Sequence, residues 1–154
     1  MTAVGLGHHG LTVTEPERTA RFFVEVLGFR VGALVELDER FSSQVSGVDG
    51  VTIVARFLEG PGVVVELLHY RGQGQAAARP RPADPGSAHL ALYVDELARV
   101  VAQSASYGWR PAGRVVEITR GPRAGGFAVY LTDADGAVVE LVQRPATPAS
   151  VQGP

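Results

Sequence analysis

The sequence predicts an α+β fold made of two tandem copies of one unit, in the order strand, helix, strand, strand, strand. Two observations predict it. Strand-like and helix-like segments follow in the same order before and after a stretch rich in Gly, Ala, Pro and Arg, residues 71–87. Each copy also opens on a histidine and closes on a glutamate within an aliphatic run. Since each copy alone would leave one sheet face bare, we expect the two copies to cover one another.

The first copy begins with GLGHHGLTV, which looks like a short strand. A helix is expected from about Glu15 to Val26, with Thr14 as its N-cap and Gly28 as its stop, because Phe22 and other apolar residues recur at helical spacing. Three strands, FRVGALVEL, VTIVARFL and PGVVVELLHY, are expected next, with the turn SGVDG before the second.

The second copy repeats this order. AHLALYV looks like a strand, DELARVVAQSASYG like a helix and RPAGRVVEI, residues 110–118, like a strand. GGFAVYLTD and AVVELVQ, separated by ADG, look like a final hairpin. The sequence therefore predicts a single domain over 1–154, with module 1 at about 5–70, a linker at 71–87, module 2 at 88–144 and a flexible tail at 145–154.

Composition excludes several classes of function. The chain has 154 residues, no cysteine, 14 basic and 16 acidic residues and a net charge of −2. This argues against disulfides, thiolate metal sites, a catalytic thiol and nucleic acid as a partner. Every basic residue is arginine, which excludes catalysis through a lysine imine. We expect a cytoplasmic protein with no membrane partner, because no signal peptide is evident and no apolar run approaches the roughly 20 residues of a membrane span.

Glu66 and Glu140 each lie inside an aliphatic run, VVVELL and AVVELV. A buried, ionised and unpaired carboxylate costs several kcal/mol, which is a large share of a domain's net stability. An arginine partner, protonation or a metal cation can offset this cost. Each opening strand carries a histidine, His8 or His89, and this placement favours the cation.

If a two-fold axis relates the copies, these four side chains converge on one point between the sheets. Two imidazoles and two carboxylates suit one divalent ion such as Zn, Ni, Co, Fe or Mn, with positions left for water or substrate. The sequence therefore predicts a metal site with His8, Glu66, His89 and Glu140 as ligands. No nucleotide cofactor is indicated, because neither GLG nor GQG opens a strand-to-helix phosphate loop.

The glutamates also have a purely structural interpretation. Either carboxylate can lie on an edge strand, where it faces solvent or pairs with Arg56 or Arg114. For His9 and His69 we expect structural roles. Tyr93 and Tyr130 are expected in the core, although either hydroxyl can reach a cleft. The arginines of RGPRAGG are expected in a solvated loop unless they cap an anionic substrate.

At these residues the sequence resembles the vicinal oxygen chelate superfamily, which includes glyoxalase I, methylmalonyl-CoA epimerase, extradiol dioxygenases, fosfomycin resistance enzymes and bleomycin-binding proteins. The matching segments are GHHGLTV, RTARFFVEVLGF, PGVVVELL, GSAHLALYVDEL and GGFAVYLTDADGAVVELVQ. The resemblance implies the glyoxalase/bleomycin resistance fold, in which paired βαβββ modules form a half-open barrel around a metal. It also implies His8, rather than His9, as the first ligand.

In this superfamily a ligand glutamate can leave the metal and take a proton next to a carbonyl group. The resemblance therefore implies an epimerase, an isomerase or a glyoxalase-type lyase, with Glu140 as the base and Glu66 as the acid that returns the proton. We expect a small oxygenated substrate. The arginine-only, Ala- and Gly-rich composition resembles high-GC actinobacteria, where such epimerases act on sugar- or cyclitol-like hydroxyketones of secondary metabolism.

Two other functions stay open. An Fe(II) extradiol-type dioxygenase uses two histidines and one carboxylate and does not need Glu66. A non-catalytic antibiotic-binding resistance protein usually lacks several of the four ligands. Retention of the full set His, Glu, His, Glu is the pattern of glyoxalase I and related epimerases. The resemblance also implies a homodimer, with a site inside one chain or shared between two.

Overall fold

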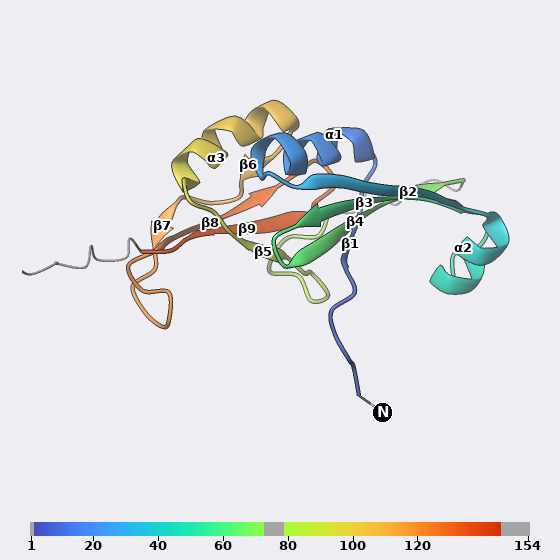
Figure 1. The fold of residues 1–154 in the computed structure, drawn as a ribbon, viewed down its shortest axis with the longest axis horizontal. Helices are drawn as coiled ribbons and strands as arrows, with labels where there is room; N and C mark the ends of the chain where they lie inside the picture. The colour runs from blue at the N-terminus through green and yellow to red at the C-terminus, as the bar shows by residue number, and fades with distance from the viewer. Residues whose placement is uncertain (1, 73–78, 146–154) are drawn as a thin grey trace, which may run out of the picture.

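The computed structural model of the chain describes residues 2–72 and 79–145. It contains two β-sheets, with helices α1 and α3 side by side against one face of the sheets (Figure 1). The predicted α+β fold is thereby confirmed. The predicted tail lies outside the described residues, apart from Pro145.

The first half forms a four-stranded sheet in the order β1-β4-β3-β2. Its strands are β1 (His9–Thr12), β2 (Arg30–Leu37), β3 (Thr52–Gly60) and β4 (Val63–Arg71). β1 runs parallel to β4, and the other neighbours are antiparallel. Helix α1 (Pro16–Arg21) continues into a π-helical turn at Phe22–Val26. This topology brings the first and last strands of the half next to each other.

The second half repeats that arrangement. Its strands are β5 (Leu90–Tyr93), β6 (Arg110–Pro111), β7 (Val116–Glu117), β8 (Phe127–Thr132) and β9 (Val138–Gln143). The order is β5-β9-β8-β6, with β7 also paired to β8, and β5 runs parallel to β9. Helix α3 (Leu97–Ser104) ends in a 3₁₀ turn at Ala105–Tyr107. The first and last strands of this half are therefore neighbours as well.

Two elements differ from the prediction. Helix α2 (Glu39–Ser46) lies between β2 and β3, where only a turn was expected. It is held by a local cap, in which Asp38 accepts a hydrogen bond from the Phe41 backbone N–H. The strand expected over 110–118 is wrong as a continuous element and survives only as β6 and β7. Pro111 has no N–H to donate and Gly113 weakens a strand, which explains the interruption.

Thr14 links the two halves instead of capping α1. The N-cap residue of α1 is Glu15, and its side chain makes no capping hydrogen bond. The Thr14 backbone N–H and hydroxyl both donate to the Asp135 carboxylate, at 2.8 and 2.7 Å. The prediction of Thr14 as N-cap is therefore wrong, because a partner 121 residues away takes its hydroxyl.

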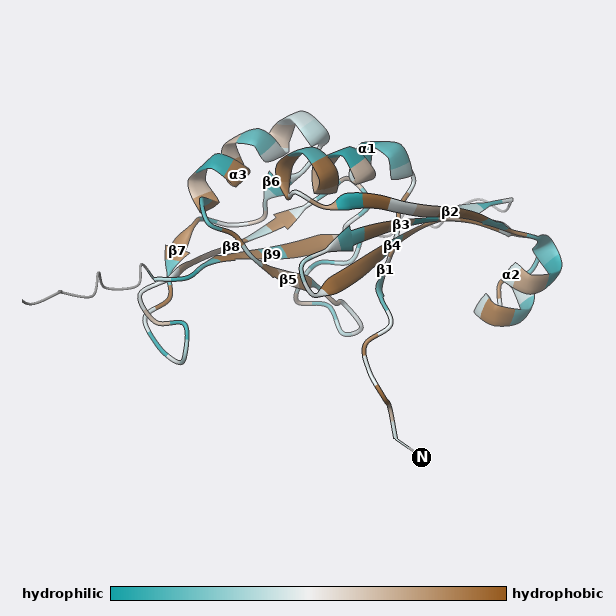
Figure 2. Ribbon diagram, in the orientation of Figure 1, coloured by the Kyte–Doolittle hydropathy of each residue, from teal (hydrophilic) through white to brown (hydrophobic). Residues whose placement is uncertain are grey.

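One apolar core joins the halves on the helical side of the sheets. It contains Phe22 and Phe23 from the first half and Trp109, Val129 and other residues from the second. The Trp109 ring stacks on Phe22, with ring centroids 4.8 Å apart. Colouring by hydropathy shows the strands largely apolar, whereas α1 and α3 mix apolar and polar residues (Figure 2). Each half thus covers the apolar face of the other, as expected from the repeat.

Replacement of Trp109 by alanine is expected to lower the free energy of unfolding by about 3–5 kcal/mol, because the fully buried ring leaves a cavity between the halves. Urea denaturation measures this loss. Trp109→Phe is the control, and we expect a smaller loss because it keeps a ring and removes an indole N–H that has no hydrogen-bond partner. Equal losses for both variants would contradict the proposed packing role.

Candidate metal and catalytic site

The fold turns Glu66 and Glu140 away from the core. Val65 and Leu67, on either side of Glu66, belong to the core cluster, as do Val139 and Leu141, which flank Glu140. Because successive side chains of a strand point to opposite faces, both carboxylates lie on the sheet faces opposite the helices. Each side chain keeps 13% of its surface exposed. Neither acid is therefore sealed in an apolar interior.

Each glutamate contacts the histidine of its own half. His8 Nε2 lies 2.8 Å from Glu66 Oε2, and His89 Nε2 lies 3.4 Å from Glu140 Oε2. Parallel pairing produces both contacts, since each histidine directly precedes an edge strand that runs beside the strand of its glutamate. Below, the first half-site means His8 with Glu66, and the second half-site means His89 with Glu140.

The residues next to the glutamates on the edge strands are small. Gly10 is opposite Glu66, and Ala91 is opposite Glu140. Residues this small add little bulk beside the carboxylates, whose side chains are 13% exposed. Both half-sites therefore present an imidazole nitrogen and a carboxylate oxygen side by side, a donor combination suited to borderline divalent cations.

The four predicted ligands lie as two pairs within the chain. Across residues 2–72 and 79–145, no group of three or more His, Asp or Glu side chains is arranged to hold a metal ion. The histidines of the two halves are nevertheless close enough to interact electrostatically. Burial lowers the pKa of His9, and the nearby imidazoles of His8 and His89 lower it further. The donor types thus fit a cation, and each half-site supplies half of the predicted set.

An aromatic ring lies against each histidine. Phe57 is opposite Glu66 in the β3–β4 register, and its ring centroid is 6.2 Å from that of His8. Tyr130 is opposite Glu140 in the β8–β9 register, with its ring 4.9 Å from His89. Tyr130 was expected in the core but is only half-buried. The sequence did not predict that Phe57 lies beside His8, because only the pairing register of β3 and β4 shows it.

One arginine reaches the second half-site. Arg123 Nη1 lies 3.7 Å from Glu140 Oε1, and the arginine side chain is 44% exposed. Sequence reasoning favoured a solvated loop for this residue. The side chain is open to solvent, as expected, and it also pairs with the acid. Glu140 therefore faces His89 with one oxygen and Arg123 with the other.

The alternative ion-pair partner Arg56 is engaged elsewhere. Arg56 Nη2 donates to Glu17 Oε1 at 3.1 Å, so the proposed pairing of Arg56 with a strand glutamate is wrong. His69 has the structural role expected of it, because its Nδ1 lies 3.2 Å from the Val13 carbonyl oxygen. Among the described residues, the nearest basic side chain to Glu66 is therefore that of His8, and the nearest to Glu140 is that of His89.

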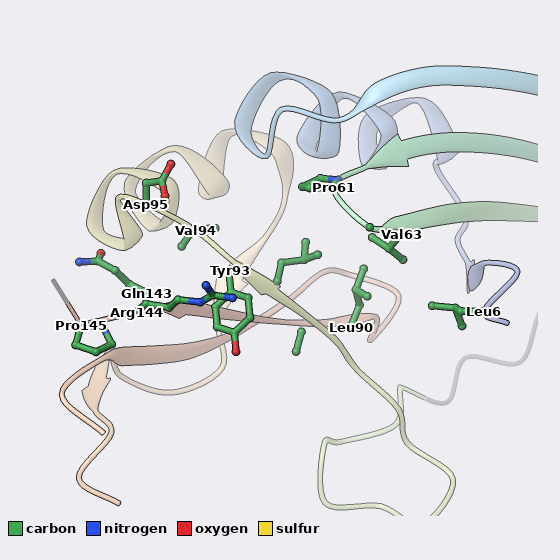
Figure 3. A pocket seen from close by; sticks show the side chains of 13 residues that line it. Leu6, Pro61, Val63, Leu90, Tyr93, Val94, Asp95, Gln143, Arg144 and Pro145 are labelled. Atoms are coloured by element: carbon green, nitrogen blue, oxygen red, sulfur yellow. The ribbon is translucent and has the colours of Figure 1, made fainter. Parts of the chain in front are cut away.

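A separate pocket of about 830 Å³ follows β5 between the halves (Figure 3). Its lining includes Leu6, Pro61, Val63, Leu90, Tyr93 and Arg144. The Arg144 guanidinium lies 3.8 Å from the centre of the Tyr93 ring. Tyr93 is exposed on the surface, so the prediction that it lies in the core is wrong. None of the four predicted ligands lines this pocket.

Residues 5–141 match the model of the Glyoxalase/Bleomycin resistance protein/Dioxygenase superfamily. The chain belongs to this superfamily. The resemblance inferred from the sequence is confirmed, and with it the glyoxalase/bleomycin resistance fold. No helix in the described part of this superfamily member is long and apolar enough to cross a membrane.

One curated relative resembles the chain in sequence, and two solved structures resemble it in fold. A 2-epi-5-epi-valiolone epimerase from Actinomyces sp. is 32% identical over 149 residues, which cover 94% of this chain and 81% of the relative. A glyoxalase-family protein from Bacillus cereus has a TM-score of 0.78 at 13% identity, covering 95% and 97% of the two chains. A fosfomycin resistance protein from Listeria monocytogenes, solved with Mn(II) and sulfate, has a TM-score of 0.62 at 16% identity, covering 94% and 96%.

Proposed function

We propose that the protein is a divalent-metal-dependent epimerase that moves a proton next to the carbonyl group of a sugar- or cyclitol-like hydroxyketone. The single observation that carries this proposal is the pair of matched half-sites, each with an imidazole and a carboxylate on the open face of its sheet. The relative named as a 2-epi-5-epi-valiolone epimerase supports the substrate class.

His8, Glu66, His89 and Glu140 together would hold one ion of Zn, Ni, Co, Fe or Mn. Such an ion, when bound, polarises a substrate carbonyl and stabilises negative charge on its oxygen. Each histidine Nε2 lies beside a carboxylate oxygen of its own half-site, so the nitrogen and the oxygen would face the same ion as two neighbouring ligands. The small residues Gly10 and Ala91 beside the glutamates would limit steric conflict with the substrate.

The two glutamates have opposite roles in the proposed reaction. Epimerisation removes a proton from one face of a carbon atom and returns a proton to the other face. Glu140 takes the proton and Glu66 supplies its replacement. Two carboxylates from symmetric positions suit this task, because each can face one side of a substrate held between them.

We further propose that the active form is a homodimer. β1 and β5 are edge strands of separate sheets, and each is preceded by the histidine of its half-site. A two-fold axis could set β1 of one protomer beside β5 of its partner. The dimer would then contain two sites, each made of the first half-site of one protomer and the second half-site of the other. The opposite edge of the first sheet carries a separate exposed apolar surface on β2 and α2 that a partner could also cover; it contains Val31, Leu34, Val35, Phe41 and Val45.

The proposal is tested by elemental analysis combined with proton–deuterium exchange in D₂O on hydroxyketones, acyl-CoA esters and hemithioacetals. We expect one divalent ion per chain and exchange on the hydroxyketones. Removal of the ion with a chelator should lower the exchange rate by at least about 100-fold, and its return should restore the rate.

Other outcomes point to different functions. Stoichiometric metal without exchange on any compound would contradict the epimerase, and oxygen uptake with iron and a catechol would then identify a dioxygenase. A protein without metal that binds an aromatic antibiotic tightly would instead be a resistance protein. Exchange confined to hemithioacetals would place the protein with the glyoxalase-type lyases.

A further inference from the structure

The two half-sites match in their ligands but differ in the aromatic residue beside them. Phe57 and Tyr130 have equivalent positions, since each lies opposite the glutamate of its half-site in an antiparallel strand pair. Directly opposed residues of such a pair share a sheet face, with Cβ atoms about 4.5–5.5 Å apart. Both rings are half-buried and both contact a histidine. The clear chemical difference between these two positions is one phenolic hydroxyl.

The Tyr130 hydroxyl has no hydrogen-bond partner among the described residues, whereas the Tyr107 hydroxyl donates to Glu25 at 2.6 Å. The Tyr130 hydroxyl is also not among the buried unpaired side-chain atoms of the described residues, so it is open to solvent, and a bound molecule could take the place of water there. The Tyr130 ring is fixed against His89, so the hydroxyl is held near the second half-site. It is therefore free to bond a molecule bound there.

A site with exact two-fold symmetry would accept the same substrate in two orientations, related by that symmetry. In one orientation Glu140 would face the proton that leaves, and in the other Glu66 would. A donor present on only one side removes this ambiguity, because a substrate oxygen gains a hydrogen bond in one orientation alone. Arg123 adds to the same asymmetry, since it pairs with Glu140 at 3.7 Å.

We propose that the Tyr130 hydroxyl donates a hydrogen bond to a substrate oxygen beside Glu140, and that Phe57 leaves the other side without a donor. This inference rests on the proposed function, which it extends from the reaction to the orientation of the substrate. Tyr130 is then a substrate-binding residue. Substrates with a hydroxyl or carbonyl oxygen at the matching position are selected over their deoxy analogues.

The test compares Tyr130→Phe with Tyr107→Phe, the same chemical change outside the half-sites, in the full-length, metal-loaded protein. Tyr130→Phe removes only the hydroxyl and keeps the ring against His89. We expect it to lower kcat/KM for the hydroxyketone that wild type exchanges best by about 10- to 100-fold, as for loss of one donor at a reacting centre. We expect Tyr107→Phe to stay within about threefold of wild type, because it removes a hydroxyl that bonds Glu25 on the helical side of the sheets.

A second readout separates substrate contact from a structural effect. Dissociation constants from calorimetry, for each hydroxyketone and its deoxy analogue, should show wild type preferring the hydroxyketone and Tyr130→Phe binding both alike. Urea midpoints of the two proteins should agree, since the hydroxyl bonds no described residue.

If wild type exchanges the substrate proton and Tyr130→Phe does so at the same rate, the role of Tyr130 is overturned but the proposed epimerase function is not. A Tyr130→Phe variant that loses activity but still prefers the hydroxyketone over its deoxy analogue would also overturn it. Wild type without exchange on any compound would remove the proposed function itself, and this inference with it.

Discussion

Glu140→Gln is expected to lower kcat for epimerisation by about 1,000-fold or more, because the amide keeps the shape of the side chain but cannot accept the proton. The epimer whose proton faces Glu140 should also stop incorporating deuterium from the solvent. The measurement is NMR of the substrate in D₂O with the metal content determined in parallel, since the amide is also a poorer ligand than a carboxylate.

Glu66→Gln is the matched control, because Glu66 has the equivalent place in the other half. We expect this variant to exchange the proton that faces Glu140 while it fails to form the opposite epimer. Metal should be supplied in excess to both variants, so that a weakened ligand set does not imitate a missing base. Equal loss of exchange in both variants at full metal occupancy would contradict the assignment of Glu140 as the base.

A heterodimer of Glu66→Gln and Glu140→Gln chains is expected to regain about half of the wild-type activity, although each parent homodimer is nearly inactive. If the site joins the first half-site of one protomer to the second half-site of its partner, one of the two sites contains both substitutions. The other site then contains neither. Co-expression with two different tags isolates the heterodimer, and the epimerisation rate per dimer is the measurement.

The same heterodimer tests the alternative directly. A site formed within one chain would carry one substitution in each protomer, so its heterodimer would be as inactive as the parents. A heterodimer of wild-type and doubly substituted chains serves as the control, because it retains an intact site only if that site lies within one chain. A monomer in solution would contradict the homodimer altogether.

Much of the fold could be predicted because its signals are local or repeated. The aliphatic run around Glu66 and its recurrence around Glu140 predicted β4 and β9 from the sequence alone. Helix α2 was missed because it exposes apolar side chains such as Phe41 and has no clear core-facing stripe, while its cap is a single Asp. Thr14 was misassigned because its partner Asp135 is distant in sequence.

The candidate site shows the same limit. Each His–Glu pair could be anticipated, because parallel pairing of the first and last strands of a unit brings them together. The distance between the two pairs could not be predicted, because it depends on how two separately hydrogen-bonded sheets pack against each other. Arg123 and Phe57 were likewise beyond sequence reasoning, since a loop contact and a strand register place them beside the glutamate and the histidine.

The stacking of Phe22 on Trp109 has an evolutionary consequence. If the chain arose by gene duplication, its ancestor was a single module that met an identical copy of itself. Once aromatic residues from both copies had specialised around a joint interior, neither module retained a complete hydrophobic face of its own. From then on the two copies were inherited as one unit, and the positions facing the substrate were free to diverge.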